Sequence, residues 1–363
     1  MSGEMPLPPR SDPDCGQAMS VASLPLVSIG LVVRNEEETI IACLDQLALQ
    51  LYPVEQLEVI AVDGESTDST RALVEAYDRL PLLRILDNPK RTQPAGLNLA
   101  LAAARGDVFC IVDGHAFLPR NYFQRAVQLL NETGAQCVGG RIETVPGGKG
   151  MIARMVAWCL SSRFGVGGSR FRVSSASGFV DTVPYGVYRR DVFDEVGWFD
   201  ERLTRNFDVD LHHRMARAGM RFYIDGSLVT QYVARSTLRG MALQAYGNGY
   251  WIGRIPTRAR IRHLVPLAFV TALALSLLVA ALGPPAGIAA SLAALPLAML
   301  VASYGATAMA FSLAAARPVG AAAIILGPIT FLVLHASYGI GTLAGISTAW
   351  RSDRHARSGP IRP

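Results

Sequence analysis

Between residues 27 and 140, short apolar runs rich in β-branched residues alternate with longer runs of helical periodicity. The short runs predict buried strands at residues 27–33, 57–62, 82–87 and 108–112. The longer runs predict helices at residues 39–51, 69–80 and 94–104. Strands that alternate with helices form a mostly parallel, doubly wound sheet, so this half of the sequence predicts an α/β domain.

A second pattern occupies the C-terminal third of the chain. No Asp or Glu occurs between Asp225 and Asp353, and residues 264–316 and 318–350 carry no charged side chain. A helix of about 20 apolar residues is long enough to cross a bilayer. We therefore predict transmembrane helices at residues 264–282, 288–311 and 319–346. The alternative, a buried apolar helical domain, is disfavoured by the length of the uncharged runs.

These patterns divide the chain into five segments. Residues 1–24 are rich in proline and contain Glu4, Asp12 and Asp14, which is typical of a disordered tail rather than a secretory leader. The α/β domain is expected over residues 25–233, and an amphipathic, basic segment at the membrane interface over 234–263. Three or four transmembrane helices over residues 264–350 and a basic tail over 351–363 complete the chain.

The net charge of +5 is concentrated beside the predicted spans. Six arginines precede the first span: Arg235, Arg239, Arg254, Arg258, Arg260 and Arg262. By the positive-inside rule they place the α/β domain in the cytoplasm, at an inner or plasma membrane that the chain crosses several times. They also suit anionic lipid headgroups, which explains the basic residues without a nucleic-acid partner.

The C-terminal tail creates a conflict, because it is also rich in arginine (Arg351, Arg354, Arg357 and Arg362). Three crossings would place it outside. Either a fourth crossing or re-entrant segment exists, or the tail departs from the positive-inside rule. The five cysteines show no metal-binding spacing and fit small buried side chains in a reducing compartment.

Polar residues follow all four predicted strands, at residues 34–37, 63–68, 88–91 and 113–115. In doubly wound sheets, ligands bind beyond the carboxyl ends of the strands. One acid in such a place could be a turn or helix cap, but four consecutive polar ends indicate a site. Neither GxGxxG nor GxxxxGK[ST] follows the first strand, so a dinucleotide site or a P-loop is not supported.

The last of these ends places two potential metal ligands, Asp113 and His115, on either side of Gly114. Mg²⁺ and Mn²⁺ prefer oxygen ligands, and Mn²⁺ also accepts imidazole. The two side chains could therefore hold one divalent ion; the alternative is a capped turn with an exposed histidine.

Further along the chain, Asp208 and Asp210 precede or open a predicted helix at residues 209–218. They are candidates for a general base, although two acids at a helix N-terminus can also simply complement its dipole. Trp251, Arg254 and Arg258 lie between this helix and the first span. They could anchor an interfacial helix or hold the diphosphate of a lipid-linked acceptor.

The motifs VSIGLVVRNEEETI, VIAVDGESTDST, NPKRTQPAGLNLALAAARGDVFCIVDGHAFLPRNY and NFDVDLHHRMARAG, in this order, resemble the inverting family 2 glycosyltransferases of GT-A fold. Within that family the chain is similar to the ExoA type of succinoglycan and other exopolysaccharide assembly. The resemblance extends over roughly residues 27–262. It implies a GT-A type, doubly wound, mostly parallel sheet followed by transmembrane helices.

The resemblance also implies roles for the residues at the strand ends. Asp63 matches the acid that pairs with the nucleobase, Glu36 lines the nucleotide pocket, and Arg91 lies in the segment that closes over the base. Asp113 matches the first acid of the family's DxD metal motif, and His115 stands in place of its last acid.

For the chemistry, Asp208 matches the family's catalytic base, with Asp210 two residues on. Phe207 stands where the family usually has another acid. The resemblance implies a metal-dependent (Mg²⁺ or Mn²⁺) hexosyltransferase that moves a sugar, with inversion, from a nucleotide-diphosphate sugar to a lipid-linked saccharide. A transferase acting on polyprenyl phosphate itself remains an alternative. So does a non-catalytic scaffold that binds nucleotide sugars, because of His115 and Phe207.

Overall fold

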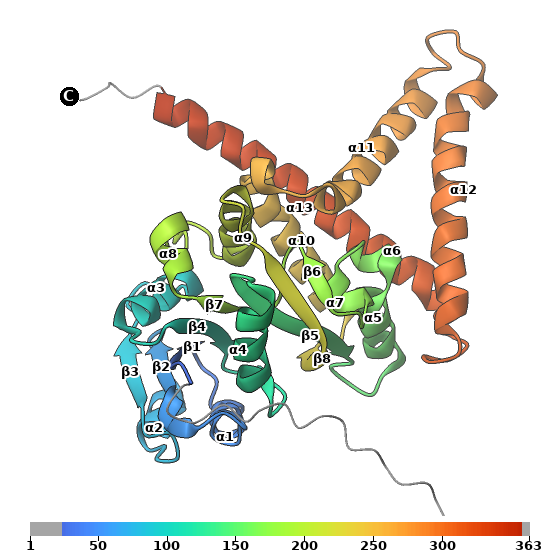
Figure 1. Cartoon of the computed structure of the whole chain (residues 1–363). Helices are drawn as coiled ribbons and strands as arrows, with labels where there is room; N and C mark the ends of the chain where they lie inside the picture. Colours follow the sequence, from blue (N-terminus) through green and yellow to red (C-terminus); the bar gives the residue numbers. More distant parts are fainter. Residues whose placement is uncertain (1–23, 358–363) are drawn as a thin grey trace, which may run out of the picture.

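The computed structural model describes residues 24–357, and an eight-stranded mixed sheet forms its centre (Figure 1). The strand order is β3-β2-β1-β4-β7-β5-β8-β6. The first four strands are parallel and are the ones that the sequence predicts, with bounds that differ by at most one residue: β1 Val27–Val33, β2 Leu57–Asp63, β3 Leu83–Asp87 and β4 Val108–Asp113. The predicted mostly parallel, doubly wound sheet is confirmed. The predicted disordered tail lies outside the described residues, apart from Leu24.

The helices between these strands are α1 (Ile40–Ala48), α2 (Thr70–Glu75) and α3 (Gln93–Ala103). The first two are shorter than the sequence predicts. Beyond the end of α2, the Tyr77 hydroxyl donates to the Asp45 carboxylate on α1 at 2.8 Å, which joins the two helices.

The second half of the sheet was not predicted. It contains β5 (Cys137–Val145), β6 (Gly178–Val180), β7 (Val187–Arg189) and β8 (Phe222–Val233). β7 is inserted antiparallel between β4 and β5, whereas β5 and β8 are parallel to each other. The parallel direction is therefore interrupted next to β4. The helices of this half are α4 (Tyr122–Thr133), α5 (Met151–Ser161), α6 (Arg163–Val166), α7 (Arg170–Val173), α8 (Asp191–Val196), α9 (Phe207–Arg217) and α10 (Leu238–Arg254).

Apolar side chains cover both faces of the parallel strands, as expected for a sheet that is buried between helices. Val59 and Ala61 of β2 belong to a core with α1 and α4, and Ile60 and Val62 belong to a second core with α3 and α9. The four cysteines in the described part of the chain are buried and free, which confirms their predicted burial.

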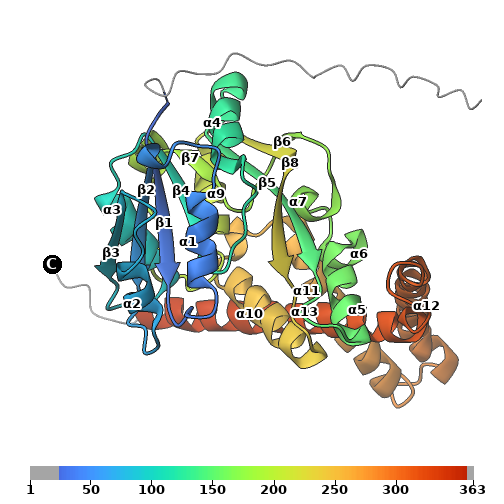
Figure 2. The ribbon, with the colours of Figure 1, turned by 90° about the horizontal axis from the view of Figure 1, so that it is seen from below.

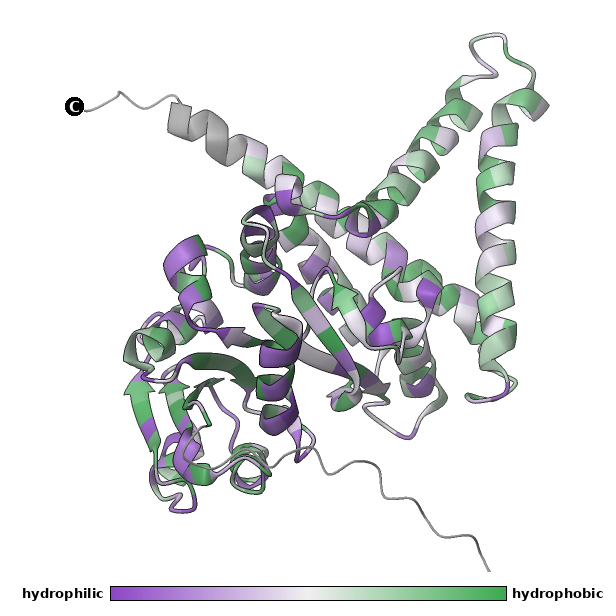
Figure 3. Ribbon diagram, in the orientation of Figure 1, coloured by the Kyte–Doolittle hydropathy of each residue, from purple (hydrophilic) through white to green (hydrophobic). Residues whose placement is uncertain are grey.

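Three C-terminal helices are long and apolar enough to cross a membrane: α11 (Ile261–Leu282), α12 (Ala290–Ala315) and α13 (Ala323–Arg357). Little of α11 and α12 is buried, and their hydrophobic surface stands clear of the α/β domain (Figure 3). This exposure is not that of a buried helical domain, so the predicted membrane helices are supported. No fourth helix of this length occurs within residues 24–357. α13 continues to Arg357, so the first seven residues of the predicted basic tail are helical.

α10 and α13 lie side by side at the base of the α/β domain (Figure 2). Glycines on both helices allow the backbones to touch, as small residues do between membrane helices. A Cβ on Gly249 would lie 2.0 Å from the Tyr338 carbonyl oxygen, and one on Gly345 would lie 2.0 Å from that of Tyr250. The α/β domain is thus fixed to the membrane helices through this contact.

Candidate active site

The carboxyl ends of β2 and β4 lie on the same edge of the sheet, on either side of β1. Val33 is in register with Asp63, and Val32 is in register with Asp113. Two neighbouring strand spacings separate the backbones of the two acids, which is about 10 Å. The structure thus brings Asp63, which was predicted to pair with the nucleobase, and Asp113, which was predicted to bind the metal, to one edge of the sheet.

Asp63 is buried and organises the loop after β2. The Ser66 N–H and hydroxyl donate to its carboxylate at 3.1 and 2.5 Å. The Asn35 side chain, from the loop after β1, accepts the Thr67 N–H at 2.8 Å. Asn35 has a positive φ of 56°, which asparagine tolerates better than most residues. The loops after β1 and β2 are therefore held together.

Arg91 lies in the loop after β3, at the same edge of the sheet. Its guanidinium forms an ion pair with Glu65, with Nε 2.6 Å from Oε2. Both side chains are about half exposed. The predicted closing segment is thus linked to the loop that follows Asp63.

The predicted metal ligands lie beside the predicted nucleotide residue Glu36. His115 Nδ1 is 3.1 Å from Glu36 Oε1, and the Gln93 amide donates to Asp113 at 2.7 Å. Gly114 permits this approach, because a Cβ there would lie 3.2 Å from Glu36 Cγ. Withdrawal from water raises the pKa of Asp113, so a cation at this place would favour its ionised form.

In the part of the chain that the structure describes, no three His, Cys, Asp or Glu side chains gather as a metal cage. Mg²⁺ ordinarily takes one or two carboxylates and fills its remaining positions with substrate phosphates and water. One carboxylate and one imidazole, two residues apart at the end of β4, fit that incomplete donor set, with the imidazole favouring Mn²⁺.

Asp208 lies in the first turn of α9, whose preceding residue Asn206 has φ +59°. Burial raises the pKa of Asp208, and the negative charge of Asp113 adds to that effect. Burial also raises the pKa of the Tyr188 hydroxyl, and the negative charge of Asp208 adds to that effect. The end of β4 is therefore close enough to the N-terminus of α9 for the charge of Asp113 to raise the pKa of Asp208.

Asp210 has a different environment, although it was predicted together with Asp208. Its side chain is 1% exposed and forms ion pairs with Arg214, at 3.0 Å, and with Arg258. Arg214 also donates to the carbonyls of Gly197 and Trp198, just after α8. Asp210 thus joins α9, the end of α8 and the segment before α11, and Arg258 is engaged in this cluster rather than free.

His212 is a buried core residue, 1% exposed. The Thr182 hydroxyl lies 2.6 Å from its Nδ1, and the Tyr188 hydroxyl lies 2.8 Å from its Nε2. Burial lowers the pKa of His212 to about 3, so the ring is neutral.

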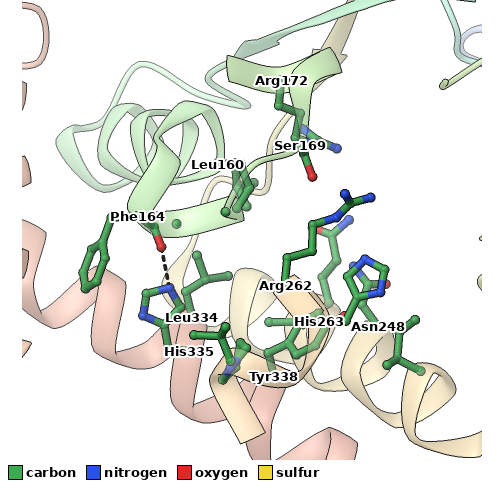
Figure 4. Close-up of a pocket in the computed structure, with 18 of the residues that line it drawn as sticks. Leu160, Phe164, Ser169, Arg172, Asn248, Arg262, His263, Leu334, His335 and Tyr338 are labelled. Carbon is green, nitrogen blue, oxygen red and sulfur yellow. Dashed lines mark hydrogen bonds between the residues drawn. The ribbon is translucent and has the colours of Figure 1, made fainter. Parts of the chain in front are cut away.

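The two other predicted acceptor residues differ from each other. Trp251 is partly buried and packs against the core that contains α3 and α9, and Arg254 is the last residue of α10. Sequence reasoning missed a cavity of about 540 Å³ between this region and the membrane helices (Figure 4). Arg262 and His263, immediately before the first uncharged run, were the signal that could have pointed to it.

Comparison with known proteins identifies the class. The model of the glycosyl transferase family 2 matches residues 28–197. The chain is 32% identical over 241 residues to the succinoglycan biosynthesis protein ExoA of Rhizobium meliloti (strain 1021), which covers 64% of this chain and 72% of that protein. The chain therefore belongs to glycosyltransferase family 2, and it is a glycosyltransferase.

A second relative and a solved structure extend this result. The dolichyl N-acetyl-alpha-D-glucosaminyl phosphate 3-beta-D-2,3-diacetamido-2,3-dideoxy-beta-D-glucuronosyltransferase of Methanococcus voltae is 27% identical, over 61% of this chain and 71% of that protein. The mannosyltransferase PcManGT from Pyrobaculum calidifontis, solved with GDP-Man and Mn²⁺, has a TM-score of 0.55 at 18% identity. The match covers 91% of this chain and 89% of the mannosyltransferase chain. This likeness confirms the GT-A fold.

Proposed function

We propose that the protein transfers a sugar, with inversion, from a nucleotide-diphosphate sugar to a membrane-anchored saccharide acceptor. The observation that carries the proposal is the strand register, which brings Asp63 and Asp113 to one edge of the sheet on either side of β1. The charge of Asp113 also raises the pKa of Asp208, which supports a place for the α9 N-terminus near that edge. A single displacement at an anomeric carbon needs a base for the acceptor hydroxyl and, in the same site, groups that hold the leaving diphosphate.

On the donor side, Asp63 hydrogen-bonds the nucleobase, Glu36 lines the nucleotide pocket, and Arg91 closes over the base. Asp113 and His115 hold a divalent cation, Mg²⁺ or Mn²⁺. When bound, this ion supplies positive charge that stabilises the diphosphate as it leaves. The mannosyltransferase neighbour, which was solved with GDP-Man and Mn²⁺, supports this assignment by fold likeness.

On the acceptor side, Asp208 takes the proton from the attacking hydroxyl. A new bond forms between that oxygen and the anomeric carbon while the bond to the diphosphate breaks, so the configuration inverts. The raised pKa of Asp208 brings the base closer to the pH at which it operates and so strengthens it. Asp210 stays ion-paired with Arg214 and Arg258 and keeps α9 in place.

We also propose that the catalytic domain faces the cytoplasm at an inner or plasma membrane that the chain crosses more than once. The apolar helices and the arginines before α11 support this orientation. The names of the two relatives, one in succinoglycan biosynthesis and one acting on a dolichyl-linked sugar phosphate, favour a lipid-linked acceptor.

The test is transfer of radiolabelled sugar from a panel of nucleotide sugars to lipid-linked saccharides by the full-length protein in detergent, with Mg²⁺ or Mn²⁺. Asp208→Asn should lower transfer by about 10²–10⁴-fold, and Asp194→Asn, an exposed acid on α8, serves as the matched control. Full turnover by Asp208→Asn refutes the assigned base. Transfer to polyprenyl phosphate itself supports the alternative transferase, and donor binding without turnover under either metal supports the scaffold.

A further inference from the structure

The cavity of about 540 Å³ lies where the catalytic domain meets the membrane helices, and its size suits a ligand. Figure 4 shows Leu160 and Phe164 from the catalytic domain opposite Leu334 and Tyr338 from α13. Pro266, near the start of α11, is part of the same wall. One end of the cavity is therefore apolar and continuous with helices that face lipid.

The other end of the cavity is cationic. Arg172 and Arg262 lie there, Arg163 is a third arginine in the lining of the cavity, and no acidic side chain lines the cavity among the residues that the structure describes. In Figure 4 the Arg172 and Arg262 side chains extend from opposite walls toward the same space, beside the Ser169 hydroxyl. Two guanidinium groups that share a space repel each other unless an anion lies between them.

Arg172 has no carboxylate partner in the described chain, and Arg262 keeps an unpartnered N–H beside its ion pair. The Arg172 guanidinium donates to Thr144 at 3.1 Å and lies over the Tyr232 ring at 4.8 Å, and no carboxylate pairs with it in the described chain. Arg262 donates to Asp181 at 2.6 Å through Nη1, but its Nε is buried and unpartnered within residues 24–357. Planar guanidinium groups with free donors match the oxygens of a phosphate.

The cavity also reaches the reaction centre. Asn206 and Val209 line it, and these residues stand on either side of Asp208 in the chain. A ligand held in the cavity by its charged group could thus extend across the N-terminus of α9 to the proposed base.

We propose that this cavity binds the phosphate or diphosphate group of the acceptor lipid together with the first part of its hydrocarbon chain. Arg172 and Arg262 hold the phosphate, and the apolar wall holds the chain. This inference rests on the proposed function and names its acceptor site. It differs from the sequence prediction for Arg254 and Arg258, since Arg258 is engaged with Asp210.

The test measures binding of farnesyl diphosphate to the full-length protein in detergent without divalent metal, beside farnesol and inorganic pyrophosphate. Farnesyl diphosphate should bind at least about tenfold more tightly than either fragment. The double variant Arg172→Gln/Arg262→Gln should lose at least about tenfold in affinity, as expected for lost hydrogen bonds to a charged group. Arg239→Gln, on the exposed face of α10, is the matched control, and Arg254→Gln tests the earlier assignment.

Unchanged affinity in the double variant overturns the proposal, as does equal binding of farnesol. Equal binding of pyrophosphate identifies a site for free phosphate rather than lipid and also overturns it. Binding of UDP and GDP with Mn²⁺ is measured in parallel. If these nucleotides fail to bind while farnesyl diphosphate binds as expected, the proposed function fails and the lipid site stands.

A separate observation concerns α13. From Ala323 to Gly345 this helix packs against the catalytic domain and α10. Ala323 and Phe331 share a buried cluster with α5, the Phe164 carbonyl accepts from His335 at 2.9 Å, and Gly341 and Gly345 meet the backbone of α10. In Figure 1 it crosses α11 and α12 rather than running alongside them, and in Figure 2 it follows the base of the domain. At 1.5 Å per residue its 35 residues extend about 52 Å, well beyond the hydrocarbon thickness of about 30 Å.

The exposed side chains of α13 form one apolar stripe on the side away from the domain: Ile325, Ile329, Leu332, Ile340, Leu343 and Trp350. Their spacing of three, four, seven or eight residues is that of a single helix face. A helix that is packed on one face and apolar on the other is suited to lie in the membrane interface.

We infer that α13 lies along the membrane surface and that only α11 and α12 cross the bilayer. The chain then returns to the side of the catalytic domain, and the arginine-rich tail obeys the positive-inside rule. This arrangement resolves the conflict that three crossings create.

The test uses one epitope tag after Pro363 and, in a second form of the protein, one between Pro284 and Pro285, in sealed inside-out membrane vesicles. Protease should remove the C-terminal tag together with the catalytic domain and leave the loop tag intact. A protected C-terminal tag beside a digested catalytic domain shows that α13 crosses and overturns the inference. A digested loop tag shows that the hairpin does not cross and overturns it as well.

Discussion

Replacing each of the two acids at the start of α9 by asparagine should give opposite phenotypes. Asp208→Asn removes the proposed base, and a general base contributes about 10²–10⁴-fold to turnover. Its effect on stability should be neutral or favourable at neutral pH. Because the pKa of Asp208 is raised in the folded protein, its stabilising contribution is present at low pH and lost as the pH rises through that pKa. At neutral pH the ionised Asp208 carboxylate therefore lowers the free energy of unfolding, and asparagine removes that effect.

Asp210→Asn should instead destabilise the protein. The substitution leaves Arg214 and Arg258 without their shared carboxylate, and breaking a buried pair costs about 3–5 kcal/mol. We expect the lower end, about 3 kcal/mol, because the two arginine side chains keep 25% and 30% of their surface exposed. The residual activity per folded molecule should exceed that of Asp208→Asn by at least about tenfold.

The assay combines thermal unfolding in detergent with radiolabel transfer, normalised to the folded fraction. Asp194→Asn provides the baseline for both measurements. If Asp208→Asn unfolds at a clearly lower temperature and keeps its turnover, while Asp210→Asn folds normally and is inactive, the assignment of base and ion pair is reversed and the reasoning is refuted.

Three further predictions concern other parts of the molecule. Gly345→Leu should lower the thermal unfolding midpoint, because its side chain would enter the backbone of α10; Gly305→Leu, where a Cβ meets nothing within 4 Å, should not. His115→Asp should raise the ratio of turnover with Mg²⁺ to turnover with Mn²⁺, since imidazole suits Mn²⁺ better; an unchanged ratio would separate His115 from the metal. The acid limb of the pH profile of kcat should lie above the ordinary aspartate range, because burial raises the pKa of Asp208, and a limb in the ordinary range contradicts this.

The parallel half of the fold was predictable because local sequence determines it. Each of its strands is an apolar run bounded by turn residues, and Asp63 and Asp113 end two of them. The three-residue strands β6 and β7 carry no such pattern, since only their neighbours in the sheet make them strands. The antiparallel strand β7 beside β4 therefore could not be predicted from the sequence.

The same distinction applies to the site. Strand ends indicated Asp63 and Asp113, and the start of a helix indicated Asp208. The ion pair of Asp210 with Arg258 joins residues 48 positions apart, so no local pattern encodes it. The inferred orientation of α13 is beyond a hydropathy pattern for a related reason: hydropathy measures how apolar a helix is, but not which of its faces packs against protein.

The glycine contact between α10 and α13 has a consequence for the product. Where two backbones touch, neither helix can slide along the other, so the depth of the reaction centre above the bilayer stays constant through turnover. A glycan anchored in that bilayer presents one of its hydroxyls at this depth. For the proposed lipid-linked acceptor, a second addition would need the lengthened glycan to bring its new terminus back to the same depth, so we expect one sugar to be added per acceptor.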